Sequence, residues 1–233
     1  MTADPLVLSA ELDRATARLL DTVRTLDGNG LVAPSRCEGW TRGHVVTHLA
    51  RNADAYRNLL SWARTGVRTP AYASPEAREA GIAAGASRPH EEQLADLVTA
   101  CDLLRESIDT MPAEGWTALV QWGMTRGVPS DPVPAARVVW ARICEVELHH
   151  VDLDAGYGPA DWPASFSLRI LHDPATPHAA TLISDDGTKL LTVADAPTVT
   201  GPVHQLAAWL TGRGTGTGLT SSTGELPSLE AWK

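Results

Sequence analysis

Two segments of the sequence carry metal-ligating side chains that are four residues apart. Glu145 and His149 form one pair, and His44 and His48 form the other. Residues four apart in an α-helix lie one turn above each other on the same face, so either pair can chelate one divalent ion from a rigid scaffold. The alternative for Glu145 and His149 is an ordinary surface pair. For His44 and His48, the alternative is that one is a capping or surface histidine and the other is a core histidine bonded to a neighbour.

The apolar pattern around the second pair indicates which histidine faces the protein interior. Apolar residues recur at helical spacing through this segment, at Val45, Leu49, Tyr56 and Leu59. This stripe places His48 and Asn52 at or near the buried face and leaves His44 at its margin. We therefore expect His48 to be a metal ligand, and His44 to support the site or to contact the substrate.

One inward histidine and the Glu/His pair together predict a three-ligand site formed by His48, Glu145 and His149. Three protein ligands leave a fourth position open, as a catalytic zinc ion requires. Imidazole and carboxylate ligands suit zinc best, although manganese, iron and nickel accept the same residue types. An open zinc site lowers the pKa of a bound water or thiol, so the predicted chemistry is the formation of hydroxide or thiolate near neutral pH.

The cysteines do not offer a second catalytic centre. Cys37, Cys101 and Cys144 form no C-x-x-C pair, and their odd number argues against a secreted disulfide scaffold. Cys101 lies in an apolar stripe, and Cys144 points about 100° away from Glu145 around a helix. Cys37 is expected to be exposed, with no partner pattern of His or Asp around it. The sequence also lacks a serine nucleophile elbow, a phosphate loop and a dinucleotide fingerprint.

Composition limits the classes of partner. The chain has 233 residues, 43% of them hydrophobic, and a formal net charge of -9, with lysine only at Lys189 and Lys233. No basic run offers a surface for nucleic acid or an anionic membrane. No stretch approaches the roughly 18 to 20 apolar residues of a membrane span, and we expect no signal peptide. The predicted protein is soluble and cytoplasmic and acts on small molecules, in an oligomeric state that the sequence leaves open.

Helices must position these residues. Apolar residues at steps of three and four predict four long helices, over about Pro5–Leu26, Thr41–Gly66, Glu91–Met111 and Pro134–Ala155. Asp27–Gly30 predicts a stop after the first helix. The connection Thr65–Pro89 has room for only a short helix, from Pro75 to Ala84, and Trp116–Gly123 is expected to be a short hairpin or irregular. Together the helices predict a four-helix bundle over residues 1–158.

Residues 159–233 predict a smaller α+β domain. Asp185-Asp186-Gly187 separates two apolar or β-branched runs, which is a strong hairpin signal. The expected elements are a helix, three strands and a second helix, over Trp162–Leu171, Ala180–Ser184, Lys189–Val193, Pro197–Thr200 and Pro202–Gly212. The tail from Gly214 to Lys233 is rich in Gly, Ser and Thr and is expected to pack as ordered coil.

Several motifs together resemble a known family. The first group is similar to the metal-site helices of DinB-like, mycothiol-dependent enzymes and comprises Glu38-Gly39-Trp40-Thr41-Arg42, His48-Leu49, Asn52, Glu145, His149 and Val151-Asp152-Leu153. The second group is more specific and resembles the mycothiol-dependent maleylpyruvate isomerases. It comprises Trp62-Ala63, Thr65-Gly66, Thr69-Pro70, Ser74-Pro75-Glu76-Ala77-Arg78, Gly212-Arg213-Gly214 and Thr220-Ser221-Ser222-Thr223-Gly224-Glu225. The resemblance spans nearly the whole chain.

The resemblance implies an N-terminal DinB-like four-helix bundle and a smaller C-terminal α+β domain that contributes to the active-site cleft. It implies a zinc- and mycothiol-dependent cis–trans isomerase that converts maleylpyruvate to fumarylpyruvate in the gentisate pathway of aromatic catabolism. His48, Glu145 and His149 carry over as zinc ligands. Arg213 carries over as the functional arginine, and its guanidinium is a natural partner for a substrate carboxylate. The expected cofactor-binding residues are Asn52 and Arg213.

The mechanism implied by the resemblance is reversible addition of the mycothiol thiolate to the cis double bond, so no protein cysteine is needed. Without the resemblance, Arg213 would be a cation near a helix C-terminus that offsets the helix dipole. A mycothiol S-transferase acting on another electrophile is the alternative function, since the same zinc-bound thiolate would serve it. A third hypothesis is a non-enzymatic metal- or ligand-binding protein whose metal site is coordinatively closed.

Overall fold

The chain folds into two compact units. The computed structural model describes residues 4–122, 124–125 and 128–229. Its units are Met1–Ala155 and Gly156–Lys233. The first unit is a bundle of helices, and the second combines helices with a four-stranded sheet. This arrangement confirms the predicted fold class, a helical bundle followed by a smaller α+β domain. The boundary expected after residue 158 lies just inside the second unit.

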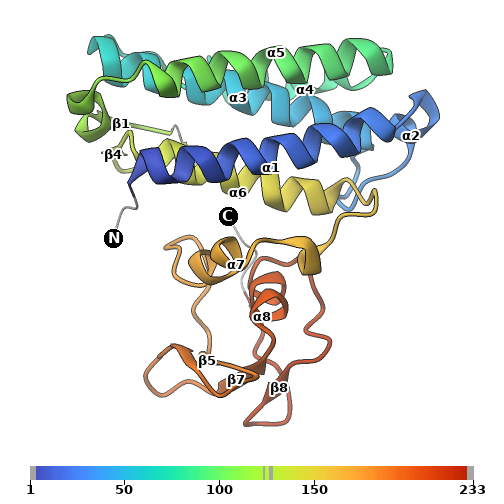
Figure 1. Cartoon of the computed structure of the whole chain (residues 1–233), viewed down its shortest axis with the longest axis vertical. Coiled ribbons are helices and arrows are strands. Elements are labelled where there is room, and N and C mark those ends of the chain that lie inside the picture. Colours follow the sequence, from blue (N-terminus) through green and yellow to red (C-terminus); the bar gives the residue numbers. More distant parts are fainter. Residues whose placement is uncertain (1–3, 123, 126–127, 230–233) are drawn as a thin grey trace. The chain divides into compact units, whose positions relative to one another are not determined.

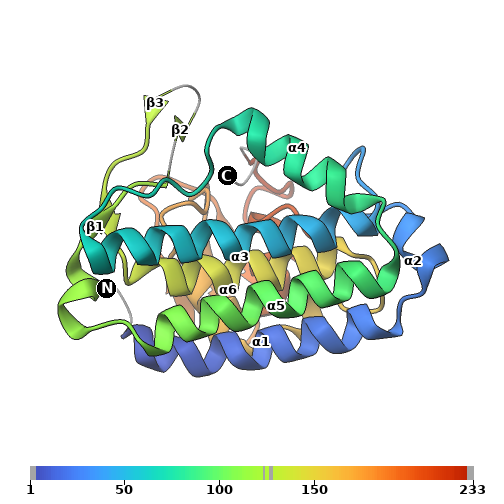
Figure 2. The same cartoon turned by 90° about the horizontal axis from the view of Figure 1, so that it is seen from above.

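Four long helices form the first unit (Figures 1 and 2). They are α1 (Pro5–Thr25), α3 (Arg42–Thr65), α5 (His90–Asp109) and α6 (Arg137–Asp152). α3 packs against both α5 and α6, and α1 packs against the same two helices. Each of the four contributes fully buried aliphatic side chains to the core, among them Leu19, Leu49, Leu97 and Ile143. None of the described helices is both long enough and apolar enough to cross a membrane.

Capping side chains set where the first helices begin. Asp4 accepts a hydrogen bond from the Leu6 amide at 2.9 Å and so caps α1. Thr41 caps α3, as predicted. The first helix ends at Thr25, so the predicted stop at Asp27–Gly30 is confirmed. The sequence did not predict that the Asp27 side chain also accepts a hydrogen bond from the Gly30 amide, at 2.6 Å. That cap starts a further short helix, α2 (Gly28–Val32).

The connection between α3 and α5 contains α4 (Pro75–Ala86), which extends beyond the expected Pro75–Ala84. Ser74 caps this helix by accepting a hydrogen bond from the Ala77 amide at 3.1 Å, and a proline at the first helical position suits the start of a helix. α4 packs against α3, so the long connection brings a third helix to the side of α3.

A 3-10 helix and four short strands follow α5. After η1 (Ala113–Thr117), the strand β1 (Leu119–Val120) pairs with β4 (Val133–Pro134), and β2 (Met124–Thr125) pairs with β3 (Val128–Pro129). Of the two alternatives for Trp116–Gly123, a short hairpin or an irregular piece, the hairpin is wrong, because β1 pairs with β4 beyond this segment. Gly123 lies outside the described residues. Because β4 uses Val133 and Pro134, α6 begins later than the expected Pro134–Ala155.

The second unit contains a mixed sheet in the order β6-β5-β7-β8. Its elements are η2 (Pro159–Asp161), α7 (Ala164–Ile170), β5 (Thr181–Ser184), β6 (Lys189–Leu191), β7 (Thr198–Gly201), α8 (Val203–Leu210) and β8 (Thr220–Ser221). β5 and β6 form the predicted antiparallel hairpin, whereas β5 and β7 are parallel. The helix expected over Trp162–Leu171 begins later, after a 3-10 turn. The tail, expected to be coil, contributes β8, and its residues 230–233 lie outside the described ones.

Candidate metal centre

The three ligands predicted from the sequence come from two helices that pack against each other. His48 lies near the start of α3, and Glu145 and His149 lie one turn apart in α6. Thr41 caps α3, and His48 is among the buried residues of that helix. The His48 side chain is only 4% exposed, as expected for the inward histidine, whereas Glu145 and His149 are partly exposed.

The candidate ligand atoms converge on one oxygen. His48 Nε2 lies 3.0 Å from Glu145 Oε2, and His149 Nε2 lies 3.4 Å from the same oxygen. The two imidazole rings meet edge to face, with their centroids 4.6 Å apart. Ligand atoms around a tetrahedral zinc ion are separated by about 3.3 Å, given bond lengths of about 2.0 Å. The donor types and their spacing therefore fit a zinc ion.

Burial and hydrogen bonding set the charges of these residues. Burial alone would raise the pKa of Glu145, but hydrogen bonds from both imidazoles hold that pKa well below its usual range. Burial lowers the pKa of His48, although Glu145 opposes the change. Burial also acts to lower the pKa of His149, but contacts with Asp152, Cys37 and Glu145 outweigh it and raise that pKa well above 6.5. Without a metal, neutral pH thus leaves Glu145 ionised, His48 neutral and His149 protonated.

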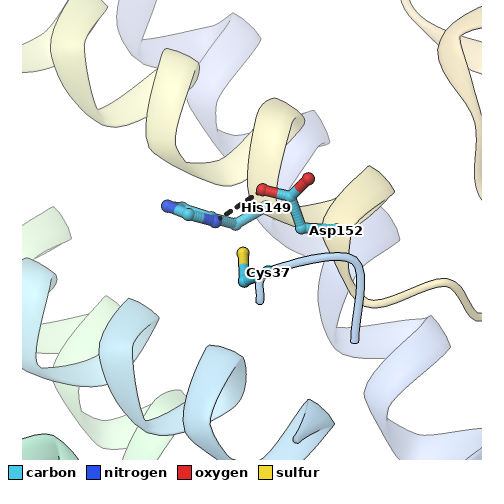
Figure 3. A group of neighbouring side chains, drawn as sticks. All are labelled: Cys37, His149 and Asp152. Carbon is cyan, nitrogen blue, oxygen red and sulfur yellow. Dashed lines mark ion pairs between the residues drawn. The ribbon is translucent and has the colours of Figure 1, made fainter. Parts of the chain in front are cut away.

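Asp152 and Cys37 adjoin the other ring nitrogen of His149 (Figure 3). Asp152 Oδ2 lies 2.9 Å from His149 Nδ1, and the Cys37 sulfur points toward the same two side chains. A carboxylate on the far nitrogen orients a metal-binding imidazole and raises its basicity. Cys37 is the least buried of the three cysteines, as predicted. The expectation that it has no His or Asp partner is wrong, because its partners come from a helix far away in the sequence. Asp152 stands three residues after His149, a spacing that could have identified it.

The loop before α3 is fixed to the end of α6. The Arg36 amide donates a hydrogen bond to the Asp152 carbonyl at 2.8 Å, and the Arg36 guanidinium pairs with Asp154 at 2.9 Å. Arg42, the first residue of α3, donates from Nε to the Leu153 carbonyl at 2.7 Å. The start of one ligand helix is therefore joined to the end of the other by the protein's own hydrogen bonds.

His44 forms part of the cap of α3. The Thr41 amide donates to His44 Nδ1 at 3.2 Å, and the Thr41 hydroxyl accepts from the His44 amide at 3.4 Å. This is a capping box in which histidine replaces the usual Glu or Gln. The Trp40 ring stacks on His44 and lies 5.5 Å from the His48 ring. His44 thus supports the ligand helix, and its contact with a substrate stays a prediction.

Asn52 faces the bundle interior, as predicted, and its amide oxygen contacts a buried arginine. Arg142 donates from Nη1 to Asn52 Oδ1 at 2.7 Å and to the Leu49 carbonyl at 2.8 Å. Arg142 is 1% exposed and was not singled out from the sequence. These bonds tie α6 to α3 beside the metal ligands. The contact of Asn52 with a cofactor stays a prediction.

Arg213 lies in the second unit, shortly after α8. Its amide donates to the Ala208 carbonyl at 2.8 Å, and its Nη1 donates to the Thr211 carbonyl at 2.8 Å. The guanidinium therefore contacts the carbonyl end of a helix, as the alternative role near a helix C-terminus predicts. The roles of Arg213 with substrate and cofactor stay predictions.

A further helix reaches His48 from outside the bundle. Arg78 of α4 places Nη2 at 3.3 Å from His48 Nδ1, and its guanidinium lies 5.8 Å from the centre of the Tyr72 ring. Neither Arg78 nor Tyr72 was assigned a role from the sequence. Arg78 does end one of the motifs that carry the family resemblance.

Comparisons with known proteins identify the family of the chain. The family model described as the mycothiol maleylpyruvate isomerase N-terminal domain matches residues 12–154. Two similar solved structures are those of the mycothiol-dependent maleylpyruvate isomerase and of a histidine-to-alanine mutant of it, each 29% identical to this chain. Each alignment covers 98% of this chain and 97% of the other, with a TM-score of 0.86. No curated protein sequence matches the chain.

Proposed function

Because the chain belongs to the mycothiol maleylpyruvate isomerase family, we propose that it is a zinc- and mycothiol-dependent enzyme that converts maleylpyruvate to fumarylpyruvate. The observation that carries the proposal is the convergence of His48, Glu145 and His149. The two similar isomerase structures are matched over nearly the whole chain, so the likeness extends to both units. The proposed setting is the cytoplasmic breakdown of aromatic compounds through gentisate.

In this proposal, His48 and His149 donate imidazole nitrogens to the metal, and Glu145 donates a carboxylate oxygen. Three protein ligands leave a position open for a thiol, and a zinc ion there would keep that thiol ionised near neutral pH. Asp152 Oδ2 lies 2.9 Å from His149 Nδ1, so its carboxylate would favour a proton on Nδ1 and leave the Nε2 lone pair for the metal. The buried position of His48 excludes water from one side of the centre.

The reaction class follows from the thiol. When bound, mycothiol would supply a nucleophile that adds reversibly to the cis double bond and so permits rotation about it. The protein then has to bind the substrate beside the metal centre, hold its carboxylates and release the trans product. We propose that Arg213 pairs with a substrate carboxylate and contacts the cofactor, and that Asn52 contributes to cofactor binding.

The experiment that tests the function is the conversion of maleylpyruvate by the purified protein, followed by absorbance with and without mycothiol, alongside metal analysis. We expect catalytic turnover that requires the thiol, tracks the zinc content and does not consume the thiol. An Arg213→Ala variant should retain zinc but bind and convert the substrate poorly. Normal kinetics in this variant would mean that Arg213 only stabilises the C-terminal end of α8.

Two outcomes would contradict the isomerase. A protein that contains zinc and consumes mycothiol stoichiometrically with another electrophile would be an S-transferase on the same scaffold. A protein whose zinc is already coordinatively saturated, and which accelerates neither reaction, would be a metal- or ligand-binding protein.

A further inference from the structure

Arg78 is a cation beside the metal centre that the proposed reaction has not used. It belongs to α4 and lies against the ligand His48, with Nη2 at 3.3 Å from His48 Nδ1. It also pairs with the neighbouring Glu79, whose side chain is 62% exposed. Exposed ion pairs are weak and screened by salt, so Glu79 does not hold the guanidinium strongly in place. Arg78 is therefore available to a stronger anionic partner.

Metal binding would remove the hydrogen-bond acceptor that His48 presents to Arg78. An arginine is always charged and its N–H groups only donate, so the present contact needs a lone pair on His48 Nδ1 and a proton on Nε2. His48 Nε2 is the atom that faces Glu145. A metal bound at Nε2 would use the lone pair there and leave the proton of the neutral imidazole on Nδ1. Two donors would then face each other, and the Arg78 guanidinium would need another acceptor.

Tyr72 supplies a second donor next to Arg78. The Tyr72 hydroxyl is buried, and its O–H has no hydrogen-bond acceptor among the described residues; Arg78 can only donate to its oxygen. The Arg78 guanidinium lies 5.8 Å from the centre of the Tyr72 ring, so the two side chains are neighbours. Burial raises the pKa of the Tyr72 phenol, which keeps its proton at neutral pH. A guanidinium and a phenol O–H together match the acceptor oxygens of a carboxylate.

We propose that Arg78 and Tyr72 form a carboxylate-binding subsite beside the metal centre, for the substrate carboxylate that is bonded to the reacting cis double bond. The identity of the substrate rests on the proposed function. Of the two carboxylates of maleylpyruvate, one adjoins the double bond and the other lies at the far end of the molecule. A cation next to a metal ligand is placed for the carboxylate nearest to the reacting carbons, and it offsets that negative charge beside Glu145.

The test uses maleate, a cis dicarboxylate that keeps the double bond and lacks the rest of the substrate. Isothermal titration of the zinc-loaded full chain compares the wild type with Arg78→Gln, Arg78→Lys and Tyr72→Phe. Arg64→Gln is the matched control, because Arg64 is an exposed arginine in the last turn of α3. We expect Arg78→Gln to raise the dissociation constant of maleate about tenfold or more, as loss of a charge-assisted hydrogen bond does. Arg78→Lys and Tyr72→Phe should have smaller effects, and Arg64→Gln none.

Three further measurements separate binding from structural support. Zinc content and thermal stability should be the same in the wild type and the Arg78 variants. The KM for maleylpyruvate should rise about as much as the maleate dissociation constant, and the KM for mycothiol should not change. Equal maleate binding by wild type and Arg78→Gln, or no saturable binding to the wild type, would overturn the proposal. Loss of zinc from both Arg78 variants would also overturn it, since Arg78 would then support His48.

The outcomes for the subsite and for the isomerase can be told apart. Maleate binding that depends on Arg78, without turnover of maleylpyruvate, would refute the isomerase and leave the carboxylate subsite. Normal maleylpyruvate kinetics in Arg78→Gln and Arg78→Lys would refute the subsite and leave the isomerase.

Discussion

Replacing Asp152 with asparagine removes the negative charge on the far side of His149 and nearly preserves the side-chain shape. Asp152 Oδ2 lies 2.9 Å from His149 Nδ1, and the Asp152 side chain is only 6% exposed. Solvent therefore screens this contact little. The backbone carbonyl of Asp152, which accepts from the Arg36 amide, is unchanged by the substitution. Asp152→Asn thus tests whether this carboxylate supports a metal ligand.

The expected loss follows from the role of a carboxylate behind a metal-binding imidazole. Removing such a partner lowers metal affinity by about 10- to 100-fold, which corresponds to about 1.4 to 2.7 kcal/mol. The burial of Asp152 favours the upper part of that range. Asp152 is also the strongest of the contacts that raise the pKa of His149. In the variant, His149 therefore holds its proton less tightly and competes less with the metal at low pH.

The assay is a competition for zinc between the protein and a chromophoric chelator, measured from pH 6 to pH 8. We expect the ratio of wild-type to Asp152→Asn affinity to grow as the pH rises, because protonation of His149 penalises the wild type more at low pH. Asp154→Asn is the matched control, because it makes the same change two residues later at an exposed side chain paired with Arg36. Thermal denaturation of both variants establishes that the fold is intact.

A zinc affinity of Asp152→Asn within about twofold of the wild type at pH 8 would refute the reasoning, because so small a loss of affinity lies below the range expected when a carboxylate partner is removed. An equal loss in Asp154→Asn would also refute it. The cause would then be a general change of charge near the end of α6 and not the contact with His149.

Three other predictions follow from the same geometry. His149→Ala should lose zinc and isomerase activity together. Its loss of zinc affinity should exceed the roughly 10- to 100-fold loss expected for Asp152→Asn, and circular dichroism should show an intact bundle. Full activity without zinc would contradict the mechanism. Zinc binding near pH 7 should release about one proton. The raised pKa of His149 leaves this residue protonated, whereas His48 and Glu145 have lowered pKa values and contribute no proton. Calorimetry in buffers of different ionisation heat measures the number of protons released, and a value of zero would contradict the protonated state assigned to His149. Thr41→Ala should lower the free energy of unfolding by about 1 kcal/mol, because α3 loses its cap. Urea denaturation measures this change. A denaturation curve with the same midpoint and slope as the wild type would show that the cap contributes nothing to stability.

The sequence predicted the parts of the site that depend on local periodicity. The spacing of Glu145 and His149 gave one face of a helix, and the apolar stripe through Val45 and Leu49 placed His48 inward. Both inferences need only helical geometry and burial. The structure brings these residues together because α3 and α6 pack against each other. The bundle class alone did not specify which helices are neighbours.

The contacts that the sequence did not predict join segments that are distant along the chain. Cys37 meets His149, and Arg78 meets His48, only after the loop before α3 and the helix α4 have packed onto the bundle. Periodicity within one element carries no information about such contacts. The same holds for β1, whose partner β4 lies beyond the expected hairpin. Asp152 was within reach of helical spacing, since it lies three residues after a predicted ligand.

The hydrogen bonds that join the loop before α3 to the end of α6 bear on how the proposed metal would be acquired. Arg36 and Arg42 connect the two ligand helices through backbone carbonyls and Asp154, without using any metal-ligating atom. These bonds and the buried apolar core of the four helices would hold the bundle together without the ion, unlike small zinc domains, which unfold without it. A bound ion could then leave and be replaced while the chain stays folded. Which divalent metal occupies the centre is then decided by the metals available in the cell and their relative affinities, not by which ion was present when the chain folded.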